Sequence, residues 1–287
     1  SVAPTLDHGL DEMERLAANV IRTHGAIPGV QAKISLDFAA PAKAAKTGRL
    51  TLVGLWGRYI LKPPTQAYPE LPEVEDATMH LASAAGLHTV PHAMIRLKSG
   101  ELAYITRRID RIKTGKVAME DLCQLTGRQT EDKYKGSLEQ AGKVIRLYSN
   151  QPGLDAVDFF ELVLFCFLTG NADMHLKNFS LWRPAEESVQ LAPAYDLVAT
   201  RLLLPGDDEE SALALNGKKK NLRRKDFDAL ARSLELSEKV RDNAYLKMAK
   251  SKKGWSGSLE KGFLSDAIRK GYSQLIKERA GQIGLKA

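Results

Sequence analysis

Residues 159–180, FFELVLFCFLTGNADMHLKNFS, join a nearly uninterrupted apolar run to a dense set of polar side chains. The apolar part is typical of a buried helix over residues 156–169. Behind it, Asp173 and Asn178 lie five residues apart, before a short strand-like segment, FSLW. This D-x-x-x-x-N spacing suits a carboxylate that receives the proton of a substrate hydroxyl and an amide oxygen that holds a metal ion. The stretch therefore predicts a phosphoryl-transfer loop.

A third polar position follows in LAPAYDLVAT, residues 191–200, where Asp196 comes eighteen residues after Asn178. A carboxylate there is a hard oxygen ligand that can bridge Mg²⁺ to nucleotide phosphates. Each residue alone has a plainer interpretation: Asp173 and Asn178 are also common turn residues, and His175 also suits a hydrogen-bonded loop histidine. Asp173, Asn178 and Asp196 taken together, in this order, favour phosphoryl transfer.

The pattern around this loop divides the chain into two halves. Short β-prone runs (49–56, 58–62, 93–97 and 101–108) surround one helical segment, 73–85, before about residue 110. The rest is helical in pattern, with helices expected at 120–126, 138–148, 156–169, 226–234, 238–248 and 259–283. We expect an α+β protein with a β-rich N-terminal lobe, residues 1–110, and a mostly helical C-terminal lobe, residues 111–287. The junction is predicted at IDRIKTGK, residues 109–116.

The first half carries two features that fit the same chemistry. Lys62 ends a strand-like run, and Glu75 follows within the helical segment. A strand lysine held by a helical carboxylate positions nucleotide phosphates in kinases, although an edge-strand lysine and a surface glutamate are the plainer alternatives. Residues 28–33, PGVQAK, form a turn whose backbone amides can approach a phosphate. One glycine is far short of a phosphate-binding fingerprint.

Composition limits the other classes of protein. The net charge of +7 admits a nucleic-acid site, but the strongest basic run, NGKKKNLRRK at 216–225, also suits a solvated loop before a helix. No apolar run reaches the length of a membrane helix, and the N-terminus lacks the order of a signal peptide, so we expect a cytoplasmic protein without a membrane partner. Cys123 and Cys166 suggest neither a disulfide nor a zinc site.

Seven segments also resemble a known family in the same order: GVQAK, ILKP, EVEDATM, RRIDR, MEDLCQ, GNADMHLKNFS and PAYDL. They are similar to the HipA-like serine/threonine kinases of bacterial toxin–antitoxin modules, and most similar to the short HipT form. The resemblance covers most of the chain. It implies a two-lobed, protein-kinase-like fold that uses ATP and Mg²⁺. It also implies a HipB-like DNA-binding antitoxin and a HipS-like small protein as partners, indirect association with DNA or tRNA, and an aminoacyl-tRNA synthetase as the substrate.

The resemblance assigns roles to individual residues. Asp173 falls on the catalytic base, Asn178 and Asp196 fall on the metal ligands, and Lys62, held by Glu75, falls on the ATP-phosphate lysine. The further nucleotide contacts it implies are Pro28, Gly29, Val30, Gln31, Ala32, Lys33, Arg107, Arg108, Ile109, His175, Leu176, Lys177 and Tyr195.

One departure from the family concerns regulation. Ala26 and Pro28 stand where the family usually carries serines whose autophosphorylation silences the kinase. The chain is then either an engineered variant or a natural member that is switched in another way, and Ala26→Ser is predicted to restore self-phosphorylation. Two other functional classes stay open, a small-molecule phosphotransferase and a non-catalytic binding module.

Overall fold

The computed structural model describes residues 6, 8–13, 15, 33–39, 49–53, 57–112, 115–184, 188–204, 206 and 208–285. The chain divides into two compact units. Unit 1 comprises Ser1–Asp76 and Val90–Lys116, and unit 2 comprises Ala77–Thr89 and Val117–Ala287. The predicted division into functional domains at residue 110 stays a prediction.

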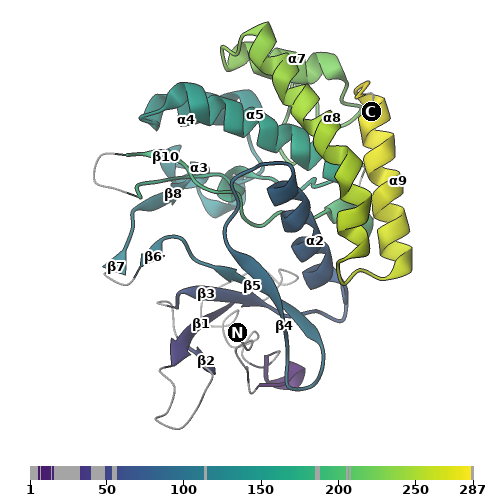
Figure 1. Cartoon of the computed structure of the whole chain (residues 1–287). Helices are drawn as coiled ribbons and strands as arrows, with labels where there is room; N and C mark the ends of the chain where they lie inside the picture. The colour runs from purple at the N-terminus through teal and green to yellow at the C-terminus, as the bar shows by residue number, and fades with distance from the viewer. Residues whose placement is uncertain are drawn as a thin grey trace. The chain divides into compact units, whose positions relative to one another are not determined.

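Unit 1 is built on a five-stranded antiparallel sheet with the order β2-β1-β3-β5-β4. Its strands are β1 (Ile34–Ala39), β2 (Arg49–Leu52), β3 (Tyr59–Lys62), β4 (His92–Arg96) and β5 (Leu102–Arg107). One face of the sheet covers a core of apolar side chains that includes Leu36, Leu50, Leu61 and Ile105. In this strand order β3 lies in the middle of the sheet, so that a neighbouring strand pairs with each of its edges (Figure 1).

Two shorter features complete the description of this part of the chain. Helix α2 (Leu71–Ala84) begins in unit 1 and ends in unit 2. A small antiparallel pair, β6 (Arg111–Ile112) and β7 (Gly115–Lys116), occupies the stretch that was predicted as the junction.

Unit 2 is mostly helical. Its strands are β8 (Met119–Asp121), β9 (Ser180–Trp182) and β10 (Gln190–Leu191), which form a small antiparallel sheet in the order β10-β9-β8. Its helices are α3 (Leu122–Leu125), η1 (Thr130–Asp132), α4 (Leu138–Tyr148), α5 (Pro152–Thr169), η2 (Leu176–Asn178), α6 (Thr200–Leu203), α7 (Arg224–Ser233), α8 (Glu238–Glu260) and α9 (Asp266–Gln282).

Helix α5 is the centre of unit 2, and its sequence explains why. Nearly all of its side chains from Asp155 onward are buried, because α4, α7, α8, α9 and β10 contact it (Figure 1). A helix that is apolar on every face is stable only where it is covered on every side. Pro152 lies in its first turn, and Gly170 ends it in the left-handed conformation, with φ 69°. The buried helix that the apolar run predicts is therefore found, and it begins four residues earlier than expected.

The largest difference from the expected boundaries concerns α8. The helix was expected to end at residue 248, before a polar stretch that contains Gly254 and Gly257. The helix instead continues to Glu260, since Trp255 and Leu259 are buried and the Trp255 ring contacts Phe165 edge-on at 5.5 Å. Both glycines lie on exposed positions of the helix, where they cost little packing. The predicted helix 259–283 accordingly begins later, at Asp266.

A smaller difference occurs at α3. Helix was predicted from residue 120, but Glu120 and Asp121 belong to β8. The Asp121 carboxylate accepts a hydrogen bond from the backbone N–H of Gln124 (2.9 Å), and the Gln124 side chain accepts one from the backbone of Asp121 (2.9 Å). This capping box starts the helix at Leu122. With a β-rich first part and a helical second part, the predicted α+β class is confirmed.

Candidate active site

Lys62 and Glu75 form a buried ion pair in unit 1. The Lys62 ammonium lies 2.5 Å from Glu75 Oε1, and the two side chains are 3% and 0% exposed. The ammonium also lies over the ring of Tyr104, 5.5 Å from its centroid. β3 is a central strand, so the alternative that Lys62 is an edge-strand lysine is wrong. Glu75 is fully buried, so the alternative that it is a surface glutamate is also wrong.

A buried ion pair is weak evidence for stability, since the cost of desolvating both charges offsets much of their attraction. A lysine on strand β3 paired with a glutamate on the following helix is the arrangement that positions nucleotide phosphates in protein kinases. The Lys62–Glu75 pair of this chain has that arrangement.

The predicted nucleotide contacts at the end of β5 lie in a well-bonded connection. The backbone N–H groups of Arg107 and Arg108 donate to the carbonyls of Pro91 (2.9 Å) and Arg58 (2.8 Å). The Arg108 guanidinium forms two hydrogen bonds with Asp110, 3.0 and 2.9 Å long. Ile109 between them is half-buried. Pro28 to Ala32, as well as Ala26, lie outside the described residues, and Lys33 is exposed directly before β1.

In unit 2, the loop that follows α5 is held at both ends. Gly170 is required there twice: its φ is positive, and an added Cβ would lie 2.5 Å from Cδ2 of the Leu275 side chain. The buried side chain of Asn171 accepts a hydrogen bond from the backbone N–H of Asp173 (3.2 Å). The Thr200 hydroxyl accepts one from the N–H of Ala172 (2.9 Å). The backbone that carries Asp173 is thus fixed before any ligand arrives.

Asp173 and Asn178 are brought together by the single turn of η2. The Asn178 amide Nδ2 donates to the backbone carbonyl of Asp173 (2.9 Å), and the backbone N–H of Asn178 donates to the carbonyl of His175 (2.9 Å). Because the amide nitrogen is occupied, the amide oxygen of Asn178 is the atom left for a cation. An amide oxygen and the carboxylate of Asp196 are ligands that suit Mg²⁺.

The carboxylate of Asp173 has a partner that the sequence analysis missed. The hydroxyl of Tyr134 donates a hydrogen bond to Asp173 Oδ1 (2.8 Å), and the Tyr134 ring meets His175 edge-on at 5.0 Å. Burial, followed by the bond to Asp173, raises the pKa of Tyr134, so the hydroxyl stays protonated and donates. No spacing rule links residues 39 apart, and the sequence therefore holds no signal for this contact.

His175 is buried beside this pair. Burial lowers the pKa of His175, Lys133 lowers it further, and the carboxylates of Asp173 and Asp196 oppose the shift. Its Nδ1 atom has no hydrogen-bond partner among the described residues. A neutral imidazole held in this way is closer to a structural histidine than to a proton carrier at neutral pH.

The other predicted contacts of unit 2 surround η2. Leu176 is buried and its backbone N–H donates to Lys133 (3.1 Å), while the Lys177 ammonium donates to the Thr130 hydroxyl (3.3 Å). The Tyr195 hydroxyl donates to the backbone carbonyl of Lys177 (3.0 Å). This bond ties the segment before Asp196 to η2.

Asp196 itself has a φ of 59°, in the left-handed region. Non-glycine residues reach this region at a cost, although aspartate tolerates it better than most. Such backbone conformations gather at functional sites, because the surrounding structure must hold them. Asp196 is thus presented by a strained turn directly after the Tyr195 contact.

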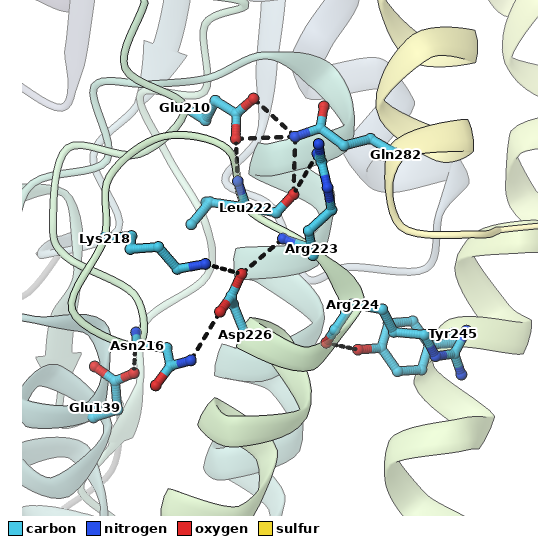
Figure 2. A network of polar contacts seen from close by, with 10 residues as sticks. All are labelled: Glu139, Glu210, Asn216, Lys218, Leu222, Arg223, Arg224, Asp226, Tyr245 and Gln282. Carbon is cyan, nitrogen blue, oxygen red and sulfur yellow. Dashed lines mark hydrogen bonds and ion pairs between the residues drawn. The ribbon is translucent and has the colours of Figure 1, made fainter.

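The segment before α7, residues 208–223, is held by the carboxylates of Glu139, Glu210 and Asp226 (Figure 2). Glu210 accepts hydrogen bonds from the backbone N–H of Leu222 (2.7 Å) and from the Gln282 side chain (2.9 Å), and it forms an ion pair with Arg279. Asp226, which is fully buried, binds the Lys218 ammonium and the Asn216 amide, each at 2.8 Å, as Figure 2 shows. Specific polar contacts therefore hold residues 208–223, which we call the strap.

The three consecutive lysines of this strap are all paired. Lys218 contacts Asp226 (2.8 Å), Lys219 contacts Glu209 (3.4 Å), and Lys220 contacts Asp208 (2.9 Å). Pairing with nearby carboxylates reduces the positive potential that a phosphate backbone would meet. The interpretation as a loop before a helix is therefore favoured over that of a nucleic-acid site.

Comparison with protein families identifies the chain. Residues 25–255 match the family described as the HipA-like C-terminal domain. The chain belongs to the HipA-like family. None of the helices in the described part of this HipA-like chain has the length and apolarity of a membrane span.

Curated relatives of this HipA-like chain are named as kinases. The protein named putative kinase Y4dM, from Sinorhizobium fredii, is 35% identical over 225 residues, which are 73% of this chain and 54% of Y4dM. A putative kinase of Haemophilus influenzae is 30% identical over 187 residues, 60% of this chain and 52% of the relative. The chain thus spans about half the length of these curated relatives.

Two solved structures share the fold. HipA of Shewanella oneidensis, solved with HipB and its operator DNA, has a TM-score of 0.72 at 20% identity. The match covers 90% of this chain and 65% of the HipA chain. The Helicobacter pylori proinflammatory kinase CtkA has a TM-score of 0.60 at 16% identity, and the match covers 87% of this chain and 93% of the CtkA chain. The HipA-like chain therefore has an α+β, kinase-like fold.

Proposed function

We propose that this chain is an ATP- and Mg²⁺-dependent serine/threonine protein kinase. The observation that carries the proposal is the buried pair of Lys62 on β3 and Glu75 on α2, 2.5 Å apart. In protein kinases this ion pair must be in place for the nucleotide phosphates to be positioned. A pair that contributes little to stability is expected where a ligand needs it.

The residues of the loop after α5 perform the proton chemistry in this proposal. Asp173 accepts the proton of the substrate hydroxyl while that oxygen bonds to the γ-phosphorus and the bond from phosphorus to the departing ADP oxygen breaks. Tyr134 and the side chain of Asn171, which accepts from the Asp173 backbone N–H, hold Asp173 in place for this step. Asn178 and Asp196 would hold Mg²⁺, which neutralises charge on the transferred phosphoryl group when it is bound.

The remaining nucleotide contacts are proposed on the same basis. The connection at Arg107, Arg108 and Ile109 would meet the adenine through backbone carbonyls, since the N–H groups of both arginines are occupied. Pro28 to Lys33 would approach the phosphates, and His175, Leu176, Lys177 and Tyr195 would complete the site.

A cellular role as a toxin is proposed on the basis of the family. We infer that the chain acts in the cytoplasm as the toxin of a toxin–antitoxin module and is restrained by a HipB-like antitoxin and a HipS-like small protein. Support comes from the HipA-like family and from the S. oneidensis structure, in which HipA accompanies HipB on DNA. The substrate would be a serine of an aminoacyl-tRNA synthetase, and its phosphorylation would arrest translation and growth.

The test is transfer of labelled γ-phosphate from ATP to the proteins of a bacterial lysate supplemented with tRNA and Mg²⁺. We compare the chain with its Asp173→Asn variant and with Asp266→Asn, a control whose carboxylate is 78% exposed on α9. The expected result is a labelled protein band with the wild type and with Asp266→Asn, and none with Asp173→Asn.

Three results would contradict the proposal. Equal labelling by Asp173→Asn and wild type would remove Asp173 from the chemistry. Consumption of ATP without any labelled protein would favour a small-molecule phosphotransferase, and failure to bind ATP with Mg²⁺ would favour a binding module.

A further inference from the structure

Unit 2 contains a pocket of about 230 Å³ that includes none of the residues proposed for nucleotide, metal or base. It lies between the first turns of α5, the connection after α2 and the β9–β10 pair. Its apolar wall includes Leu162, the Trp182 ring and Pro193, and its polar groups are Gln151, Asp155, Asp158, Gln190 and His88. Pockets for drug-sized ligands are roughly 300–1,000 Å³. This one suits a single side chain.

The two carboxylates of the pocket differ in how they are bonded. Asp155 is saturated: it accepts hydrogen bonds from the Ser149 hydroxyl (2.6 Å), the Gln151 amide (3.0 Å) and the backbone N–H of Leu191 (2.7 Å). Asp155 therefore joins α5 to β10 and is part of the fold.

Asp158, almost one turn further along α5, is half-buried and lines the same pocket. Among the described residues it accepts no hydrogen bond and forms no ion pair. The cation that acts on it from α8, Lys247, is committed to Glu161 (2.5 Å) and to the carbonyl of Gly86 (3.1 Å). Burial, the largest cause, raises the pKa of Asp158.

A half-buried carboxylate without a donor costs free energy, and a cationic ligand would remove that cost. Trp182 also lines the pocket, and an indole ring is a group on which a planar cation can stack. A guanidinium group meets both conditions, because it binds a carboxylate through two parallel N–H groups and stacks on aromatic rings, which an ammonium group does less well.

We propose that this pocket binds the arginine side chain of a partner protein, with the guanidinium group on Asp158 and against Trp182. Such a partner would touch the segment that leads to Asp196, because Pro193 and Ala194 line the pocket and the backbone N–H of Ala194 donates to the carbonyl of His88 (2.7 Å). The proposal does not depend on the kinase activity of the chain.

The experiment measures binding of N-acetyl-arginine amide to the whole chain at pH 7 by calorimetry and by Trp fluorescence. N-acetyl-citrulline amide, which has the same shape without the charge, is the matched control ligand. N-acetyl-lysine amide tests whether a planar cation is required. Saturable binding at one site is expected for the arginine probe, with affinity about tenfold or more above that for citrulline, and weaker binding is expected for lysine.

Two variants locate the site. Asp158→Asn is expected to reduce affinity for the arginine probe about tenfold or more, to the level of citrulline. The exposed control Asp266→Asn is expected to bind like the wild type.

The proposal is overturned if the arginine probe shows no saturable binding, if citrulline binds equally well, or if Asp158→Asn binds as the wild type does. Equal or tighter binding of the lysine probe would overturn the assignment of a guanidinium. The comparison of ligands on the wild-type chain tests the proposal even if a variant does not fold.

Discussion

The hydroxyl of Tyr134 donates a hydrogen bond to Oδ1 of Asp173, the proposed base, over 2.8 Å. A hydrogen bond to an ionised group contributes about 1.5–3 kcal/mol. We therefore expect Tyr134 to position Asp173, and its ring in turn rests against His175.

Tyr134→Phe is expected to lower kcat for phosphate transfer about 10- to 100-fold and to leave the KM for ATP unchanged. Steady-state kinetics with varied ATP provide the measurement. An unchanged kcat would contradict the positioning role, whereas a faster enzyme would show that Tyr134 obstructs the site.

The Lys62–Glu75 pair allows function to be separated from stability. Lys62→Met or Glu75→Leu alone removes one half of a buried ion pair, which typically costs about 3–5 kcal/mol of unfolding free energy. The double variant removes both charges and is expected to recover most of this stability but none of the phosphate transfer. Denaturant unfolding and the labelled-phosphate assay provide the two readouts. A double variant that regains activity would show that the pair serves only the fold.

The first turn of helix α7 carries the buried carboxylate of Asp226, which binds residues of the strap in front of the helix. Burial alone would raise the pKa of Asp226, but Lys218, Asn216 and the backbone N–H of Arg223 outweigh it and hold the pKa below its ordinary value. Asp226→Asn is expected to lower the unfolding free energy by about 1–3 kcal/mol at pH 7. The stability that Asp226 contributes is present above its unfolded-state pKa of about 3.9 and is lost as pH falls through the lower folded-state pKa.

The measurement is denaturant unfolding of both proteins from pH 7 to the lowest pH at which they remain folded. The difference between wild type and Asp226→Asn should shrink as the pH drops below about 4. A difference that stays constant over this range would show that the carboxylate charge is not what holds the strap.

Helix α5 carries a carboxylate for which the opposite result is expected. Burial raises the pKa of Asp158, the neighbouring Asp155 adds to the shift, and His88 and Lys247 oppose it. The wild type therefore loses stability as pH rises from about 3.9 through the raised folded-state pKa. Asp158→Asn should be at least as stable as the wild type at pH 7, with an advantage that disappears at pH values below about 3.9.

The same unfolding series tests this expectation. Asp226→Asn and Asp158→Asn make the same chemical change in two helices of one unit, so each is the control for the other. Destabilisation of both variants to the same extent at pH 7 would contradict the contrast between a bonded and an unbonded carboxylate.

The net charge of +7 does not by itself make the whole molecule a nucleic-acid binder. Its longest lysine run is neutralised locally by Asp208, Glu209 and Asp226. Lys219→Gln with Lys220→Gln is therefore expected to leave tRNA affinity and its salt dependence unchanged. If both lysines contacted phosphates, the slope of log K against log salt would become shallower by about 2. Binding titrations at several salt concentrations distinguish the two results.

Short-range features of the molecule were predictable from the chain. The bounds of α4 match the expected residues 138–148, and α5 ends at the predicted Thr169, because helical periodicity and a terminal glycine act within a few residues. The loop that carries Asp173 and Asn178 follows directly. Their spacing of five residues suggested their roles, whereas the hydrogen bond between the Asn178 amide and the Asp173 carbonyl was not predicted.

Contacts between distant segments were decided by the tertiary structure. Burial of Trp255 against Phe165 carried α8 past its expected end at residue 248. Tyr134 reaches Asp173, and the three lysines at 218–220 reach their carboxylate partners, through packing that no local pattern encodes. The sequence by itself determined the fold class, the central helix and the order of the polar loop residues, because these depend on periodicity and local geometry. The tertiary structure decided which charges are buried, paired or left without a partner, because burial and pairing depend on segments that meet only when the chain folds.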